Sequence, residues 1–283
     1  MRILLFGASG RLGTAIQRVL PHHEYLTPTG TEVDLTNREA VEVYIDAHTV
    51  DVIVNCAAYN DVNGAEAKPD LADALNGYGP GYIATAAAKQ NVPVVHFSTD
   101  YVFDGTQQAG YVESDIPNPE SAYARSKRLG ETEVLAKNPR SYIIRTSRLY
   151  GLPGTDPGAK RSFVEIIIDL AKEKPTFDIN NSEVSSPTLV DDMARHLETH
   201  IFTFPEPGIY HMANEGGCTW YEWASAAAAI LNLPVTITPR DPALNVQTVK
   251  KPAYSILLST KIPPMRSWQE ALEDFLLNHY VRT

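Results

Sequence analysis

Tyr123 and Lys127 are the two side chains of this sequence best suited to moving a proton. They stand four residues apart in Tyr-Ala-Arg-Ser-Lys, and on a helix this spacing places both on one face, about 6 Å apart at Cβ. A nearby ammonium favours the ionised form of a phenol, so we expect Lys127 to lower the pKa of Tyr123. The same spacing occurs on many solvated helices, so the rest of the chain must supply the groups on which the pair would act.

A glycine-rich turn near the start of the chain predicts a cofactor for the pair. Gly7, Gly10 and Gly13 follow the apolar residues 2–6 and precede a helical pattern that reaches Leu20. Glycines at this spacing permit a tight turn, close approach to a phosphate and close packing of helix on strand. The free N–H groups of the helix start bind a pyrophosphate. We therefore predict a dinucleotide-binding turn.

The next strand, residues 24–27, bears on whether the cofactor carries a 2′-phosphate. It ends in Pro28-Thr29-Gly30, without the acid that binds the ribose 2′-hydroxyl of NAD in many such folds. This absence favours NADPH, with NADH still possible. Arg11 could pair with the 2′-phosphate, or it could simply lie on a solvated helix start.

The elements that position these groups alternate between strand and helix three times before residue 100. Strand patterns at 51–58 and 92–97 flank a long helix, residues 70–90, in which Asn76 faces either a ligand or solvent. This order predicts right-handed βαβ units and an α/β, Rossmann-like, doubly wound parallel sheet. Ser98, Thr99, Asp100 and Tyr101 follow a strand at its carboxyl end, where ligands bind in such sheets.

Beyond residue 151 the alternation loosens, which predicts a second lobe. We expect residues 1–151 and about 180–203 to form the NADP-binding domain, and residues about 152–179 and 204–283 to form a smaller substrate-binding lobe. A Pro- and Gly-rich loop is expected at 152–160. Thr219 with Glu222 has the form of a capping box, so a helix should begin there.

Composition limits the partners. The chain has 283 residues and a net charge of −10, which disfavours nucleic acid and anionic membranes. No apolar run approaches the roughly 18 residues of a membrane span, so we expect a cytoplasmic protein. The two cysteines and the histidine pairs His22-His23 and His196/His200 show no complete metal-ligand pattern, so we predict no metal.

Several longer motifs match one family along nearly the whole chain. The matching segments are residues 5–13, 34–36, 54–59, 98–105, 123–127, 145–147, 186–188 and 252–255, and the segment Ser98 to Gly105 is the most specific. On these motifs the chain resembles the dTDP-4-dehydrorhamnose reductase family of extended short-chain dehydrogenases/reductases. The resemblance implies NADPH-dependent reduction of the C4 keto group of dTDP-4-dehydro-L-rhamnose, in the synthesis of dTDP-L-rhamnose for cell-wall polysaccharide, and a possible homodimer.

The resemblance also implies roles for individual residues. Thr99 and Tyr123 would polarise the carbonyl, Tyr123 would donate the proton, and Lys127 would hold the nicotinamide ribose. The expected cofactor-binding residues are Gly7, Ser9, Gly10, Arg11, Leu12, Gly13, Asp34, Leu35, Ala57, Ala58, Tyr59, Asn76, Ser98, Tyr123 and Lys127. The expected substrate-binding residues are Thr99, Asp100, Tyr101, Tyr123, Arg148 and Lys251.

Three positions depart from the family pattern. Arg148 replaces a Trp that would pack on the sugar, so either it reaches the nucleotide diphosphate or the substrate differs. Ala15 replaces a Glu with which some members bind Mg²⁺ between subunits, and Lys251 replaces an Arg. Two alternatives therefore stay open: a reductase of another nucleotide-4-ketosugar, and a non-catalytic NADP-binding subunit like the β subunit of methionine adenosyltransferase.

Overall fold

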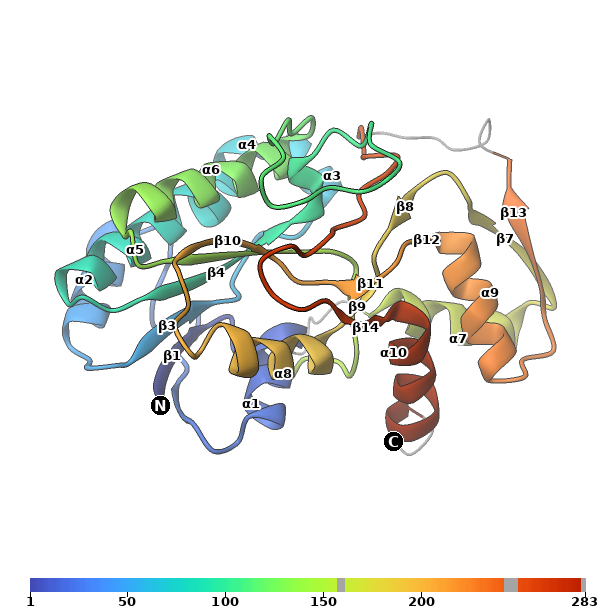
Figure 1. Cartoon of the computed structure of the whole chain (residues 1–283), viewed down its shortest axis with the longest axis horizontal. Coiled ribbons are helices and arrows are strands. Elements are labelled where there is room, and N and C mark those ends of the chain that lie inside the picture. The colour runs from blue at the N-terminus through green and yellow to red at the C-terminus, as the bar shows by residue number, and fades with distance from the viewer. Residues whose placement is uncertain (157–160, 242–248, 281–283) are drawn as a thin grey trace.

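A six-stranded, entirely parallel sheet forms the centre of the protein, whose computed structural model describes residues 1–156, 161–241 and 249–280. The strand order is β10-β5-β4-β3-β1-β2 (Figure 1). The bounds are β1 Arg2–Phe6, β2 Glu24–Leu26, β3 Val52–Asn55, β4 Val94–Thr99, β5 Tyr142–Thr146 and β10 Gly208–His211. The predicted α/β class and parallel sheet are confirmed.

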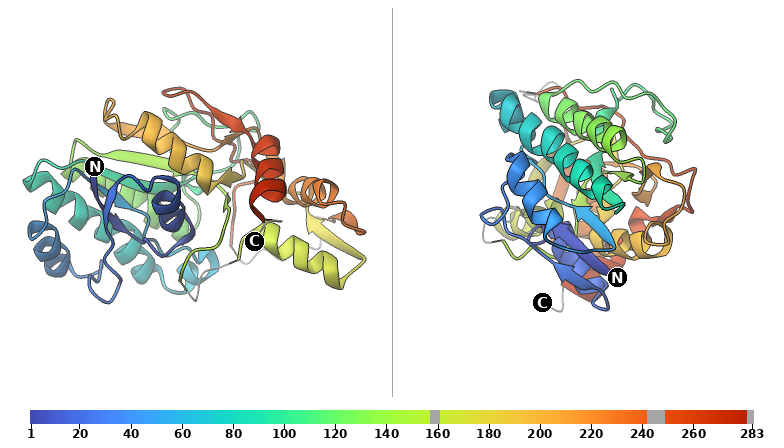
Figure 2. Two further views of the ribbon diagram at one scale, coloured as in Figure 1. Left: turned by 90° about the horizontal axis from the view of Figure 1, so that it is seen from below. Right: turned by 90° about the vertical axis from the view of Figure 1, so that its left-hand side faces the viewer.

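Helices cover both faces of the sheet, which explains why its strands read as continuous apolar runs. On one face lie α1 (Arg11–Val19) and α8 (Val190–His200), which share a core with β1 and β4. On the other lie α2 (Arg38–Asp46), α5 (Gly79–Lys89) and α6 (Ala122–Lys137). Figure 2 shows the two helical layers from the side. Within α6, Ser121 caps the helix by accepting from the Ala124 N–H.

The helix predicted over residues 70–90 is interrupted. After the short helix α3 (Val62–Ala67) come α4 (Pro69–Ala72), a π-helical turn (Asp73–Tyr78) and α5. Pro80 has no N–H to donate to the carbonyl of Asn76, so a regular α-helical hydrogen bond is missing at this point. The π-helical turn packs closely on α6, because a Cβ at Gly130 would lie 2.2 Å from the Asn76 carbonyl oxygen.

The remaining elements form a second lobe beside the carboxyl ends of the strands (Figure 1). They are β6 Leu149–Tyr150, α7 Phe163–Glu173, β7 Thr176–Asn180, β8 Val184–Ser185, β9 Thr188–Leu189, β11 Asn214–Glu215, β12 Cys218–Thr219, α9 Trp220–Ile230, β13 Thr236–Arg240, β14 Met265–Ser267, and α10 Trp268–Asp274 with a π-helical turn Phe275–Tyr280. A separate core around Trp223, Tyr150 and Phe275 holds it together. The predicted capping box of Thr219 and Glu222 is present.

The structure revises one domain boundary. Residues 204–283 were all predicted to belong to the second lobe, but β10 pairs with β5 at the edge of the central sheet. The apolar strand Gly208–His211 completes the sheet because it directly follows α8, which packs on α1. Residues 157–160 of the predicted Pro- and Gly-rich loop lie outside the described residues.

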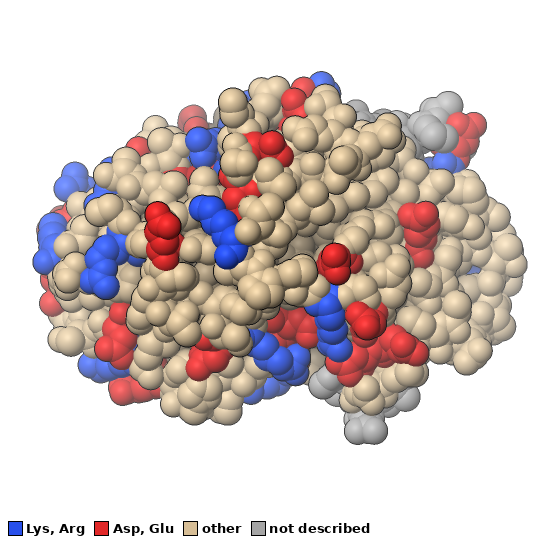
Figure 3. Space-filling view, in the orientation of Figure 1, with Lys and Arg blue, Asp and Glu red and all other residues tan. Residues whose placement is uncertain are grey.

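The described surface carries mixed charge. On the face shown in Figure 3, Lys and Arg side chains are interspersed with Asp and Glu. Among the residues that the structure describes, no helix combines the length and apolar character needed to span a membrane.

Candidate active site

The glycine turn packs tightly between β1, β3 and α1. Gly7 has a φ of +73°, and a Cβ there would lie 2.5 Å from the backbone nitrogen of Ala57. A Cβ at Gly13 would lie 2.3 Å from the Gly7 carbonyl oxygen. Both glycines are therefore required for the turn to fold onto the neighbouring backbone. Ala57, which follows β3, therefore lies directly against the turn.

The first turn of α1 is open to an anion. Its N-cap is Gly10, which has no side chain to accept from the N–H groups of the first turn. Such uncapped donors and the positive end of the helix dipole bind phosphate. The exposed Ser9 and Gly10 border this site. These backbone groups fit the pyrophosphate of a dinucleotide.

The Arg11 side chain does not point to an open cofactor surface. Its guanidinium donates to the carbonyl of Gly151 and lies 3.1 Å from a carboxylate oxygen of Glu165 in α7. The Asp156 N–H donates to the Ser9 carbonyl over 3.2 Å. Arg11 therefore ties the glycine turn to the second lobe, and pairing with a 2′-phosphate would require this ion pair to open.

The three predicted catalytic side chains meet where β4 ends. Thr99 is the last residue of β4, and α6 brings Tyr123 and Lys127 against it. The Thr99 hydroxyl lies within hydrogen-bonding reach of the Tyr123 phenol. The Tyr101 ring contacts that of Tyr123 edge to face, with 6.0 Å between centroids. The spacing of four residues and the strand end thus produce one cluster.

The electrostatics of the pair differ from the prediction. Burial raises the pKa of Tyr123 to about 12, and the hydrogen bond with Thr99 only partly opposes this rise. Burial also lowers the pKa of Lys127 to about 8. The Lys127 ammonium donates to the Phe97 carbonyl over 2.6 Å. Loss of solvation therefore outweighs any effect of the ammonium on the phenol, and Tyr123 is a neutral acid at physiological pH.

Asp100 is enclosed by hydroxyl groups that the sequence did not single out. Its Oδ2 accepts from Ser147, Ser185 and Ser255 at 2.9, 3.0 and 2.6 Å, and its Oδ1 accepts from Thr99 at 3.0 Å. The carboxyl is 2% exposed, and burial raises its pKa against the effect of the three serines. Asp100 thus orients Thr99 and does not present a free carboxylate to a substrate. The only sequence signal for this cluster was that all three serines lie in or beside the motifs that match the family.

Asn76 has a similar connecting role. Its amide accepts from the N–H of Tyr59 at 2.8 Å and donates to the Tyr59 carbonyl and to Ser126 Oγ, both at 3.0 Å. Ser126 stands between Tyr123 and Lys127. The side chain predicted to face either a ligand or solvent is buried and joins the loop after β3 to α6.

Three other predicted cofactor residues differ in their exposure. Asp34 is exposed and accepts from the N–H and hydroxyl of Thr36, each at 2.8 Å, while Leu35 is buried. Ser98 is buried, and its hydroxyl lies near the buried carboxylate of Glu131.

Arg148 is already engaged. Its guanidinium donates to the carbonyls of Cys218 and Glu183 at 2.8 and 2.9 Å and lies 4.0 Å from the centre of the Trp220 ring. It therefore joins the residue before β8 to β12, and contact with a diphosphate would require these bonds to break. Lys251 is half-buried, and the adjacent Lys250 forms an ion pair with Glu120.

Comparison with known proteins agrees with this geometry. The family model described as the RmlD substrate binding domain matches residues 1–281. The chain is 34% identical over 281 residues to the spore coat polysaccharide biosynthesis protein SpsK of Bacillus subtilis, covering 97% of this chain and 96% of that protein. It is 33% identical over 283 residues to a dTDP-4-dehydrorhamnose reductase of Mycolicibacterium smegmatis, covering 96% and 84%.

Solved structures are similar over the full length. A dTDP-4-dehydrorhamnose reductase from Bacillus anthracis in complex with NADP has a TM-score of 0.92 at 31% identity, covering 100% of this chain and 99% of that chain. Another from Clostridium acetobutylicum has a TM-score of 0.92 at 33% identity, with 100% of each chain covered.

Proposed function

The chain belongs to the dTDP-4-dehydrorhamnose reductase family, and we propose that it reduces the C4 keto group of dTDP-4-dehydrorhamnose to give dTDP-L-rhamnose, with NADPH as the reductant. The enzyme is an NADP-dependent oxidoreductase that acts on a nucleotide sugar. The observation that carries the proposal is the buried, protonated Tyr123 beside Thr99, at the sheet edge that also holds the glycine turn.

The cofactor, when bound, supplies the hydride. The donors of the α1 N-terminus would hold its pyrophosphate, and Lys127 would turn from the Phe97 carbonyl toward its ribose hydroxyls. Tyr123 would donate a hydrogen bond to the sugar carbonyl, and Thr99 would do so once its hydroxyl turns from Asp100 Oδ1, which favours negative charge on the carbonyl oxygen. Tyr123 would then transfer its proton to that oxygen. A phenol that keeps its proton to high pH suits this direction of reaction.

A reductase of another nucleotide-4-ketosugar is the second candidate. This candidate is supported by position 148, where the family pattern has a Trp that would pack on the sugar. Here the residue is Arg148, and its guanidinium stacks on the ring of Trp220. Another relative, 33% identical, is described as a probable dTDP-4,6-dihydroxy-2-methyloxan-3-one 4-ketoreductase, so the family covers more than one ketosugar. The non-catalytic alternative is less well supported, since Thr99, Tyr123 and Lys127 meet in one cluster.

Oxidation of NADPH in the presence of dTDP-4-dehydrorhamnose tests the proposal. We expect turnover by the wild-type protein and a loss of 10²-fold or more in kcat for Tyr123→Phe, with cofactor affinity nearly unchanged. Tyr142→Phe is the matched control, because Tyr142 is also buried but donates to the Pro205 carbonyl, outside the cluster.

The outcomes separate the candidates. No turnover of this sugar, with turnover of a different nucleotide ketosugar, would favour the second candidate. Binding of NADP without turnover of any ketosugar, together with function retained by Tyr123→Phe, would favour the non-catalytic role. A homodimer and a cytoplasmic location, both expected from the sequence, stay predictions; light scattering of the purified protein tests the first.

A further inference from the structure

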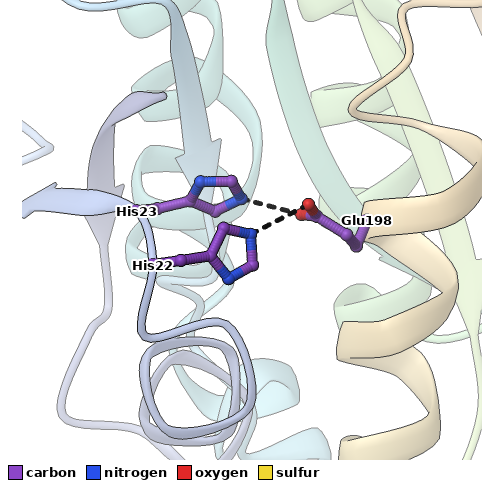
Figure 4. Close-up of side chains that lie close together, drawn as sticks. All are labelled: His22, His23 and Glu198. Carbon is purple, nitrogen blue, oxygen red and sulfur yellow. Dashed lines mark hydrogen bonds and ion pairs between the residues drawn. The ribbon is translucent and has the colours of Figure 1, made fainter.

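Two adjacent histidines and a distant glutamate converge on the side of the sheet away from Tyr123. His22 and His23 lie in the turn before β2, and Glu198 lies in the last turn of α8 (Figure 4). His22 Nε2 is 3.1 Å from Glu198 Oε1, and His23 Nε2 is 2.7 Å from Glu198 Oε2. The sequence offered the two histidines without a third ligand, and the fold supplies it from a residue 175 positions after His23.

The spacing of these three donors suits a small metal ion. Zn²⁺ binds imidazole nitrogen and carboxylate oxygen at about 2.0–2.2 Å, so two ligand atoms of a tetrahedral site lie about 3.3 Å apart. The nitrogen-to-oxygen distances of 3.1 and 2.7 Å are shorter than this value and run to different oxygens of Glu198, so the three side chains would move slightly apart around a bound ion. The three ligand atoms all lie within 4.8 Å of one another. Among the described residues, no other group of three or more His, Cys, Asp or Glu side chains meets this spacing.

The ligands differ in how firmly they are held. The His23 side chain is 5% exposed and packs edge-on against Tyr25 and Phe202, so its ring is fixed with Nε2 toward Glu198. The His22 side chain is 58% exposed and the Glu198 side chain 33%, which leaves solvent access on the outer side. A fixed inner ligand and two adjustable outer ones allow an ion to enter from solvent.

We propose that His22, His23 and Glu198 form a binding site for a divalent transition-metal ion, Zn²⁺ by its donor set, with water in the remaining position. Two imidazoles and one carboxylate match the ligands of known zinc sites that keep one position open. His23 Nδ1 lies 3.2 Å from the Met1 nitrogen, while Nε2 of the same ring faces Glu198. The ion would join the turn before β2 to α8.

The proposed site lies apart from the groups that carry the proposed reduction. The turn precedes β2, so it lies at the amino ends of the parallel strands, whereas Thr99 lies at a carboxyl end. The ion is therefore expected to change thermal stability without changing turnover of NADPH.

Zinc titration of untagged, chelator-treated protein at pH 8 tests the proposal. We expect one Zn²⁺ per chain by calorimetry and a rise in Tm of about 5 °C when free zinc is about 100-fold above Kd. Co²⁺ should give the visible absorption of a four-coordinate site. Both signals should be lost in Glu198→Gln, which keeps the side-chain shape, and in the exposed His22→Ala.

His196→Ala is the matched control. It removes one ring of the other histidine pair on α8, in which the His196 and His200 centroids are 4.3 Å apart. Zinc binding retained by this variant and lost in Glu198→Gln supports the site. No stoichiometric binding by the wild type, or binding that disappears only with His196→Ala, would overturn it. Neither result affects the assignment of the reductase, which NADPH oxidation measures separately.

Discussion

Replacement of Lys127 by Met should stabilise the cofactor-free protein while it removes activity. Lys127 is 3% exposed, and burial lowers the pKa of its ammonium from 10.5 to about 8. Such a fall corresponds to about 3 kcal/mol of preference for the neutral amine in the folded state. At pH 7 the amine is charged, so the native state bears this cost. Met has a similar length and no charge to desolvate.

The pH dependence gives the sharper test. Because the folded pKa lies below the unfolded one, the cost is complete below pH 8 and disappears as pH rises toward 10.5. The free energy of unfolding of Lys127→Met should exceed that of the wild type by about 3 kcal/mol at pH 7 and by about 1 kcal/mol at pH 10. Urea unfolding at the two pH values, without cofactor, measures both differences.

Lys137→Met is the control, because Lys137 lies on the same helix but is exposed and pairs with Glu133. Its effect should stay within about 0.5 kcal/mol at either pH. If Lys127→Met is destabilising at pH 7, or if the difference does not change with pH, the hydrogen bond to Phe97 and the attraction of Glu131 outweigh desolvation, and the reasoning fails.

Three further predictions concern the groups around this pair. The kcat/KM of reduction should fall as pH rises through about 8, because Lys127 loses its charge there while Tyr123 keeps its proton to about pH 12; a pH–rate profile flat to pH 10 would contradict a role for the ammonium. Asp100→Ala should lower the free energy of unfolding by about 2 kcal/mol or more in urea, because three buried serine hydroxyls lose their acceptor, and unchanged stability would refute this account. Arg11→Ala should leave the NADPH to NADH ratio of kcat/KM unchanged, because Glu165 already holds the guanidinium, whereas a tenfold loss of NADPH preference would show that Arg11 leaves Glu165 to read the 2′-phosphate.

The fold and the position of the catalytic cluster could be predicted because they depend on local patterns. The spacing of Tyr123 and Lys127 fixes their common helix face. Thr99 follows an apolar run, and the ends of parallel strands share one edge of the sheet. The glycine turn likewise stands between a strand and a helix that are adjacent in sequence.

The environment of these residues could not be predicted, because it depends on contacts between distant segments. The sequence shows that a lysine is near a tyrosine, but not that both are buried, and burial reverses the expected shift of the Tyr123 pKa. The role of Asp100 depends on Ser255, 155 residues away. The stacking of Arg148 on Trp220 joins the segment between β5 and β6 to the start of α9.

Asp100 and the hydroxyl groups around it combine a local contact with contacts between distant segments. Thr99 donates to one carboxylate oxygen, and the other accepts from Ser147 after β5, Ser185 in β8 and Ser255 in the second lobe. The orientation of the Thr99 hydroxyl beside Tyr123 is therefore set by both lobes at once. Any movement of the second lobe that displaces Ser185 or Ser255 would leave a buried carboxyl short of donors, which costs about 1–3 kcal/mol for each lost partner. The second lobe is thus tied through Asp100 to Thr99, the residue that we propose polarises the sugar carbonyl.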